Sequence, residues 1–307
     1  MRLISIALFL SAGLAPLHVG GPPPVTGWWT HWRIDPGVVV LALGVAAAYI
    51  LWVGPLNRRR PGAVERPVRA GQAVAFLGGC LALLIALGPP LDDWSHYFLL
   101  SAHMVQHLIL TLVVAPLWLI GLPEWVFAPL TRRAIPRRIG YALTRPLVAF
   151  ALPSVVFAAW HVPALYDAAL AREPVHILEH QLFLLTALLG WWPILGRVPA
   201  WPRPAPPLRC LYLFALTVPS GITGAVITLA EPGLYAAYDD APRLWGLDLA
   251  TDQEIAGLLM WVGVNAFYLL LITIIFFGWA AGEETKERRG GHRYGAAELA
   301  ERTPGGV

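Results

Sequence analysis

Long apolar stretches alternate with short polar ones along almost the whole chain. The hydrocarbon core of a bilayer is about 30 Å thick, and a helix crosses it with roughly 20 apolar residues. Pro, Gly or charged residues separate each apolar stretch from the next. We therefore predict an all-α fold, a polytopic transmembrane helix bundle of about seven helices. The predicted spans lie near residues 37–54, 71–88, 97–121, 146–163, 176–196, 208–230 and 255–280.

The two ends of the chain differ from this bundle. In residues 1–20, Arg2 precedes an apolar run that leads into Gly and Pro, which predicts a signal peptide or an extra N-terminal helix. Residues 21–282 form the predicted transmembrane bundle. Residues 283–307 are charged and rich in Gly, which predicts a disordered cytoplasmic tail.

The composition excludes an ordinary soluble domain. Hydrophobic residues make up 57% of the chain and charged residues 13%, whereas about 25% of a soluble domain is charged. The net charge is only +3, and the basic residues form short clusters instead of one continuous face. These features argue against a nucleic-acid partner and predict a lipid bilayer as the surroundings.

The charge of the loops predicts the orientation of the bundle. Arginines gather in residues 57–70, 131–145 and 197–209 and in the tail, whereas the alternate loops are acidic. By the positive-inside rule the arginine-rich segments are cytoplasmic and the acidic loops are outside. The C-terminus is therefore predicted in the cytoplasm.

Six of the nine histidines fall in the outer half of this predicted bundle: His96, His103, His107, His161, His176 and His180. The motifs HMVQH and HILEH each hold two histidines four residues apart, so both rings share a helical face and can bind one metal ion. A single histidine in a bilayer is usually a packing residue. Two such pairs on different spans favour function, because polar groups are costly there.

The predicted ligands are His103, His107, His161, His176 and His180. His96 lies two turns before His103 on the same predicted helix, about 10 Å away, and with Asp92 and Asp93 it is predicted to receive an incoming ion. Glu179 and Gln106 are predicted to orient imidazoles.

Imidazole ligands suit copper, zinc, iron or nickel. The thioether of Met104 would add preference for Cu(I), although core packing is the alternative role for Met104 and Met260. No catalytic residue is predicted. Two other uses stay open: three histidines and a carboxylate could hold zinc in an intramembrane hydrolase, and histidines on facing helices could bind haem b.

Two smaller features concern packing. Gly221 and Gly224 are predicted to allow close approach of two helices. Asp252 and Glu254 precede the last apolar stretch, where their negative charge suits the N-terminus of that helix.

Four stretches resemble the CtaG family of caa(3)-type cytochrome c oxidase assembly factors, and they occur in the family's order: SAHMVQHLIL (101–110), WHVPALYDAAL (160–170), HILEHQLFLLTALLGWWPI (176–194) and WGLDLATDQEIAGLLMW (245–261). The resemblance covers about residues 30 to 280. It implies a multi-pass, non-enzymatic protein of the bacterial inner cell membrane that helps build a haem–copper oxidase by supplying copper to its subunits. The family's histidine motifs correspond to the five predicted ligands. The chain lacks the Cys pairs of soluble copper chaperones, so copper transfer would use His and Met.

Overall fold

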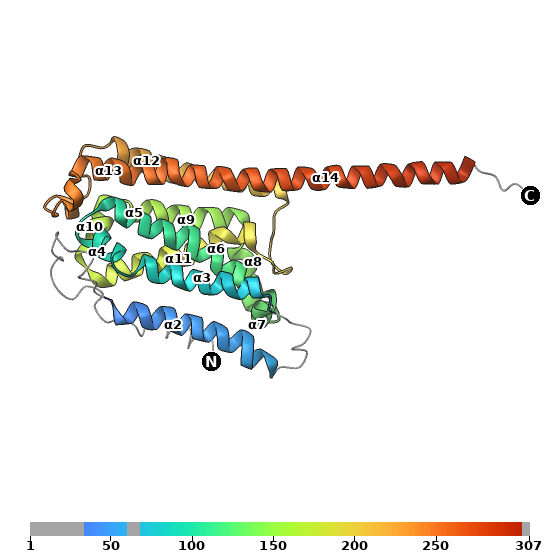
Figure 1. Ribbon diagram of the computed structural model, residues 1–307, viewed down its shortest axis with the longest axis horizontal. Helices are drawn as coiled ribbons and strands as arrows, with labels where there is room; N and C mark the ends of the chain where they lie inside the picture. The colour runs from blue at the N-terminus through green and yellow to red at the C-terminus, as the bar shows by residue number, and fades with distance from the viewer. Residues whose placement is uncertain (1–33, 60–67, 303–307) are drawn as a thin grey trace, which may run out of the picture.

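The computed structural model describes residues 34–59 and 68–302 (Figure 1). All regular elements in these ranges are helical, and they include no strand. Five helices are long and apolar enough to cross a membrane, or up to seven if each of two bent pairs counts as one span. The predicted all-α bundle of about seven spans is therefore confirmed. The predicted signal peptide or extra helix at residues 1–20 lies outside the described residues.

The helices follow one another along the chain in this order. The first half of the chain contains α2 (Pro36–Leu51), η1 (Trp52–Leu56), α3 (Ala70–Ala86), α4 (Leu91–Tyr97), α5 (Leu100–Leu108), η3 (Ile109–Val114), α6 (Ala115–Gly121), η4 (Glu124–Phe127), α7 (Ala128–Thr131) and α8 (Ala134–Leu143). The second half contains α9 (Pro146–Trp160), α10 (Pro163–Ala171), α11 (Glu173–Leu195), α12 (Pro206–Leu229), η5 (Ala236–Tyr238), η6 (Leu244–Gly246), α13 (Leu249–Leu258), η7 (Leu259–Gly263) and α14 (Val264–Arg302).

The long helices run side by side, so the bundle has two distinct ends (Figure 1). Helices α4 and α10 and the start of α13 lie at one end, which we call the histidine end. Helices α7 and α8 lie at the other end, which we call the arginine end, and α14 extends beyond the bundle on that side.

The predicted single span over residues 97–121 is wrong at its start. Helix α4 stops at Tyr97, and α5 begins only at Leu100, because Leu99 has an extended backbone (φ −134°, ψ 122°). Helix α4 instead follows α3 with a bend of 41°. His96 therefore does not share a helix with His103.

Asp252 explains why α5 begins where it does. Its carboxylate accepts hydrogen bonds from the backbone N–H groups of Leu100 (2.7 Å) and Ser101 (3.1 Å), and from the Ser101 hydroxyl. The first N–H groups of a helix have no partner within it, so a buried carboxylate stabilises them. Asp252 lies in the first turn of its own helix α13, as predicted, but the residue that caps α13 is Asp248, which accepts from the Thr251 N–H (2.9 Å). The Asp252 carboxylate caps α5 instead.

A wide, π-helical turn, η3, follows α5. Such turns leave carbonyl groups outside the α-helical pattern, and in a bilayer these must find partners inside the protein. The Thr111 hydroxyl donates to the His107 carbonyl (2.8 Å), and the Trp191 indole donates to the Thr111 carbonyl (2.7 Å). The turn is thus tied to α11.

Close packing joins α12 to α13 and η7, as the glycines predict. A Cβ atom at Gly224 would lie 2.6 Å from the backbone nitrogen of Trp261 and 2.7 Å from the carbonyl oxygen of Gly257. Gly221 leaves more room, with the Asn265 amide 3.3 Å from the corresponding position. Gly224 is therefore the position where the two backbones meet.

Helix α14 continues past residue 283 to Arg302, where the sequence predicts disorder. Residues 283–302 are rich in Glu, Arg and Ala, which are good helix formers. This part of the predicted tail is thus helical in the structure.

Candidate metal centre

Five histidine rings from three helices gather at the histidine end. His103 and His107 come from α5, His161 ends α9, and His176 and His180 come from α11. We call these five residues the histidine cluster. The i, i+4 spacing places the two rings of the α5 pair 4.3 Å apart between centroids, and likewise the two rings of the α11 pair.

The pairs on α5 and α11 face each other. The ring centroids of His103 and His176 are 5.4 Å apart. Those of His107 and His180 are 5.2 Å apart. All four side chains are buried. The four rings therefore lie in one cluster, while their binding of a metal stays a prediction.

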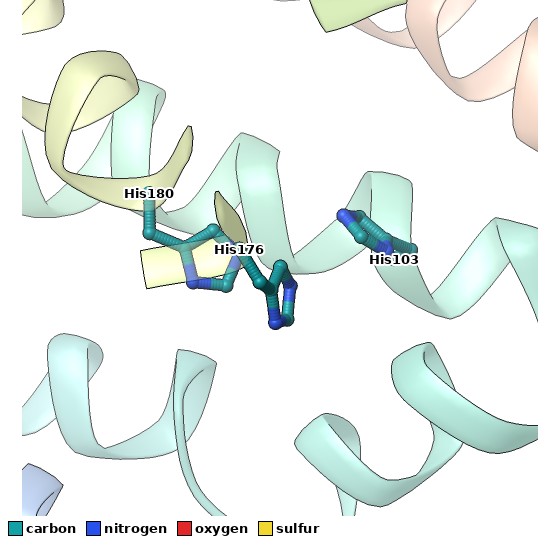
Figure 2. Close-up of side chains that lie close together, drawn as sticks. All are labelled: His103, His176 and His180. Carbon is teal, nitrogen blue, oxygen red and sulfur yellow. The ribbon is translucent and has the colours of Figure 1, made fainter. Parts of the chain in front are cut away.

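Two overlapping groups of side chains could each hold an ion. The first consists of His103, His176 and His180 (Figure 2). His103 comes from α5, and the other two come from α11. The second consists of His103, His107 and Glu179. Within each group, ligand atoms lie within 4.8 Å of one another. His103 belongs to both, so the two groups form one continuous set of ligands.

Within the second group, the Nε2 atoms of His103 and His107 are only 2.8 Å apart. Two imidazole lone pairs at that distance repel each other. One nitrogen must therefore carry a proton and donate it, or a cation must bind both.

Glu179 is predicted to orient imidazoles, but its carboxylate lies beside the ring nitrogens of both α5 histidines. One carboxylate oxygen lies 3.7 Å from the Nε2 of His107, and the other lies 4.0 Å from the Nε2 of His103. The side chain is fully buried, and neither oxygen has a hydrogen-bond partner within the described part of the chain. A buried carboxylate needs a proton or a cation beside it. Glu179 is therefore itself a candidate ligand.

His161 borders the cluster. Its Nδ1 donates to the Phe157 carbonyl (2.7 Å), which leaves Nε2 as the acceptor. That Nε2 is buried and has no hydrogen-bond partner among the described residues. Metal-binding histidines commonly hold one nitrogen in this way and bind with the other. The nearest ring of the α5 pair, His107, is 6.4 Å away, and His161 belongs to neither three-residue group.

The residues predicted to receive an ion lie on α4. His96 stands beside α11, with its ring centroid 5.8 Å from that of His176. Asp92 accepts a hydrogen bond from the Gln106 amide (2.9 Å), and Asp93 is buried. The Gln106 amide also donates to a carbonyl of α3. Gln106 thus joins α3, α4 and α5, in place of its predicted role of orienting an imidazole.

The Met104 side chain lies in an apolar part of the bundle. It is 1% exposed and packs with Met260, Ile227 and Ala256 in an apolar cluster. Its described contacts are those of core packing.

Comparison with known families now identifies the chain. The family model for the cytochrome c oxidase caa3 assembly factor (Caa3_CtaG) matches residues 47–281. The chain belongs to this family. The matched region contains the whole histidine cluster, and the resemblance seen in the sequence is confirmed. No curated protein and no solved structure matches the chain.

Three tyrosines of this assembly factor contact residues of the cluster, and no motif in the sequence marks them. The Tyr238 hydroxyl donates to the Ser95 carbonyl (2.6 Å) and lies 3.0 Å from the Tyr166 hydroxyl and 3.4 Å from the Nδ1 of His103. The Tyr235 hydroxyl donates to a carbonyl at the end of α9 (2.9 Å). Burial raises the pKa of the Tyr238 phenol well above its usual range, so its hydroxyl stays protonated.

Gln253 anchors the loop that carries Tyr235 and Tyr238. Its side-chain oxygen accepts from the N–H groups of Gly233 and Leu234. Its amide donates to three carbonyls at the end of α12, those of Ile227, Ala230 and Glu231. The loop between α12 and α13 is therefore anchored. The contacts that Tyr238 of this loop makes with Tyr166 and Ser95 span 72 and 143 residues of chain, so no local motif could have indicated them.

Proposed function

We propose that this assembly factor binds copper in the histidine cluster and delivers it to a subunit of cytochrome c oxidase. The observation that carries the proposal is the pair of overlapping ligand groups joined through His103. Imidazole nitrogens are suitable ligands for copper, and the family membership supplies an oxidase as the target. The role is binding and transfer, not catalysis.

The surplus of ligands favours transfer over permanent storage. The two groups together offer five side chains, and His161 stands beside them. An ion held by His176 and His180 could exchange these ligands for His107 and Glu179 while keeping His103. Such stepwise exchange never strips the ion of all its ligands at once.

The loop charges support a delivery site on the outer side of the bacterial inner membrane. Arginines of residues 131–145 belong to the arginine end, and Asp92 and Asp93 belong to the histidine end. The positive-inside rule then puts the arginine end and the C-terminus in the cytoplasm. Oxidase copper centres lie toward the outer face, and His96 with the two aspartates would be the entry from that side.

The close packing of the rings argues for a small ion over haem b. A macrocycle between two axial histidines needs a gap, whereas the Nε2 atoms of His103 and His107 are 2.8 Å apart. A zinc hydrolase would use the same ligands as the copper site, so the metal itself must be measured.

The test is the metal content of the full-length protein purified from its own membranes, with its absorbance spectrum. His180→Ala removes one ligand and should lower copper content, because each ligand contributes strongly to affinity. His292→Ala, which removes a histidine more than 100 residues along the chain from the predicted ligands, serves as the matched control. In the same cells, the copper content of the oxidase should fall with His180→Ala while the amount of the assembly factor in the membrane stays unchanged.

Several outcomes would contradict the proposal. Zinc in place of copper in the wild-type protein would favour the hydrolase, and a haem spectrum would favour haem b. Normal oxidase copper with His180→Ala, at wild-type protein level, would exclude delivery from this site. Lower protein abundance with unchanged oxidase copper per molecule would assign His180 to packing alone.

A further inference from the structure

Helix α8, at the arginine end, is amphipathic and buries none of its residues. Ile135 and Ile139, one turn apart, are 73% and 55% exposed. Arg137 and Tyr141 lie one turn apart on the other side, with Arg138 beside them. The helix turns by 67° from α9, the spanning segment that follows it. A helix of this character lies along the membrane interface with its apolar face toward the acyl chains.

A pocket opens on the basic side of α8. It has a volume of about 380 Å³ and is lined by Arg137, Arg138, Tyr141 and Ala200. Ala200 belongs to the connection between α11 and α12, so two separate parts of the chain line the pocket. Its volume is within the range of small-molecule sites, about 300–1,000 Å³.

No carboxylate from the described part of the chain lines this pocket. Residues 125–166 and 196–209, which surround it in the sequence, contain no Asp or Glu. Among the described residues, neither Arg137 nor Arg138 takes part in an ion pair. Two guanidinium groups that line one pocket favour an anion, and their planar donors match phosphate oxygens particularly well.

Packing against Trp201 holds α8 in position. The Trp201 indole donates to the Arg137 carbonyl (3.2 Å), and a Cβ atom at Gly140 would lie 2.3 Å from the Trp201 ring. Trp201 is buried and packs edge-on against Trp192, with 5.0 Å between ring centroids. Trp201 therefore holds α8 beside the neighbouring Ala200, and Gly140 is needed for the close contact.

We propose that this pocket binds the phosphate of an anionic phospholipid in the leaflet at the arginine end. The basic pocket would take the headgroup, and the exposed Ile135 and Ile139 would contact the acyl chains beside it. The apolar face next to the pocket is the reason for choosing a lipid over free phosphate, which would use only the arginines. The site is independent of the histidine cluster, which lies at the opposite end of the bundle (Figure 1).

The test uses full-length protein in detergent micelles with added phosphatidylglycerol or phosphatidylcholine, and counts bound lipids by native mass spectrometry. Each arginine near the surface is expected to strengthen binding about fivefold, so Arg137→Gln with Arg138→Gln should weaken phosphatidylglycerol binding roughly thirtyfold. The matched control, Arg58→Gln with Arg59→Gln, removes the same charge from exposed residues after η1 and should leave this binding unchanged.

Gly140→Ala distinguishes binding in the pocket from attraction by positive charge alone. It keeps every arginine but forces α8 away from Trp201, and it should also weaken phosphatidylglycerol binding. Thermal unfolding of each variant shows whether the bundle is intact.

Three results would overturn the proposal. Equal losses in the two arginine pairs would indicate attraction by overall charge. Equal binding of phosphatidylcholine and phosphatidylglycerol would exclude a site for anionic lipid. Displacement of the lipid by inorganic phosphate at equal concentration would assign the pocket to a soluble anion.

Discussion

Replacement of Asp252 tests whether a distant carboxylate positions the histidine cluster. The side chain is 2% exposed and accepts two backbone N–H groups and one hydroxyl at the start of α5. Asp252→Ala would leave these donors without partners. His103 lies in the first turn of α5, so fraying of that turn would displace the residue shared by both ligand groups.

The expected cost follows from the number of donors. A buried donor left unsatisfied costs about 1–3 kcal/mol, and two backbone donors together should cost about 3 kcal/mol after local relaxation. For a protein of this size that corresponds to a fall in Tm of roughly 6–12 °C. Asp252→Asn keeps one acceptor oxygen and should give an intermediate loss.

The assay combines thermal unfolding in detergent with hydrogen exchange of the α5 amides. Asp248→Ala is the matched control, because Asp248 caps α13 from an exposed position four residues earlier. The control should reduce Tm less and leave exchange at Leu100 and Ser101 unchanged. Equal Tm losses in the two variants, or unchanged exchange in Asp252→Ala, would refute the capping argument.

Three other predictions concern the site and the packing. Tyr238→Phe removes the hydroxyl near His103 and should weaken metal binding about tenfold in a metal titration; unchanged affinity would show that the hydroxyl does not influence the ligand. Gly224→Ala should cost about 1–3 kcal/mol by crowding two backbones, whereas Gly278→Ala, with no neighbour within 4 Å, should leave Tm unchanged; equal Tm values would contradict the close contact. Removal of metal by a chelator should lower the Tm of the wild-type protein, because a bound metal stabilises only the protein that binds it. The Tm of a variant with both His103→Ala and His180→Ala should not change. An equal fall of Tm in both proteins would place the metal elsewhere.

Periodic features of this fold could be predicted from the sequence. Spans are long and uniformly apolar, and histidines four residues apart must share a helical face whatever surrounds them. The ends of the helices could not be predicted in the same way. The break before Leu100 depends on Asp252, which lies 152 residues further along the chain, so no local signal marks it.

The side chains that surround the histidines could not be predicted from the sequence for a similar reason. Glu179 lies between two histidines in the HILEH motif, and only the packing of α11 against α5 turns its carboxylate toward His103 and His107. Tyr238 reaches the site through a loop that Gln253 anchors. Such contacts depend on which helices become neighbours, which periodicity does not specify.

The wide turn η3 has a consequence for the register of α5 and α6. A π-helical turn accommodates one residue more than the α-helical pattern needs. If the residues of Ile109–Val114 were instead wound as an ordinary α-helix, α6 would be rotated by about 100° relative to the histidines. The Trp118 ring, which stacks on Phe76 of α3, would then face away from it. The extra residue thus lets one part of this span, α5, turn its histidines toward α11. The other part, α6, can at the same time turn its apolar side chains toward α3.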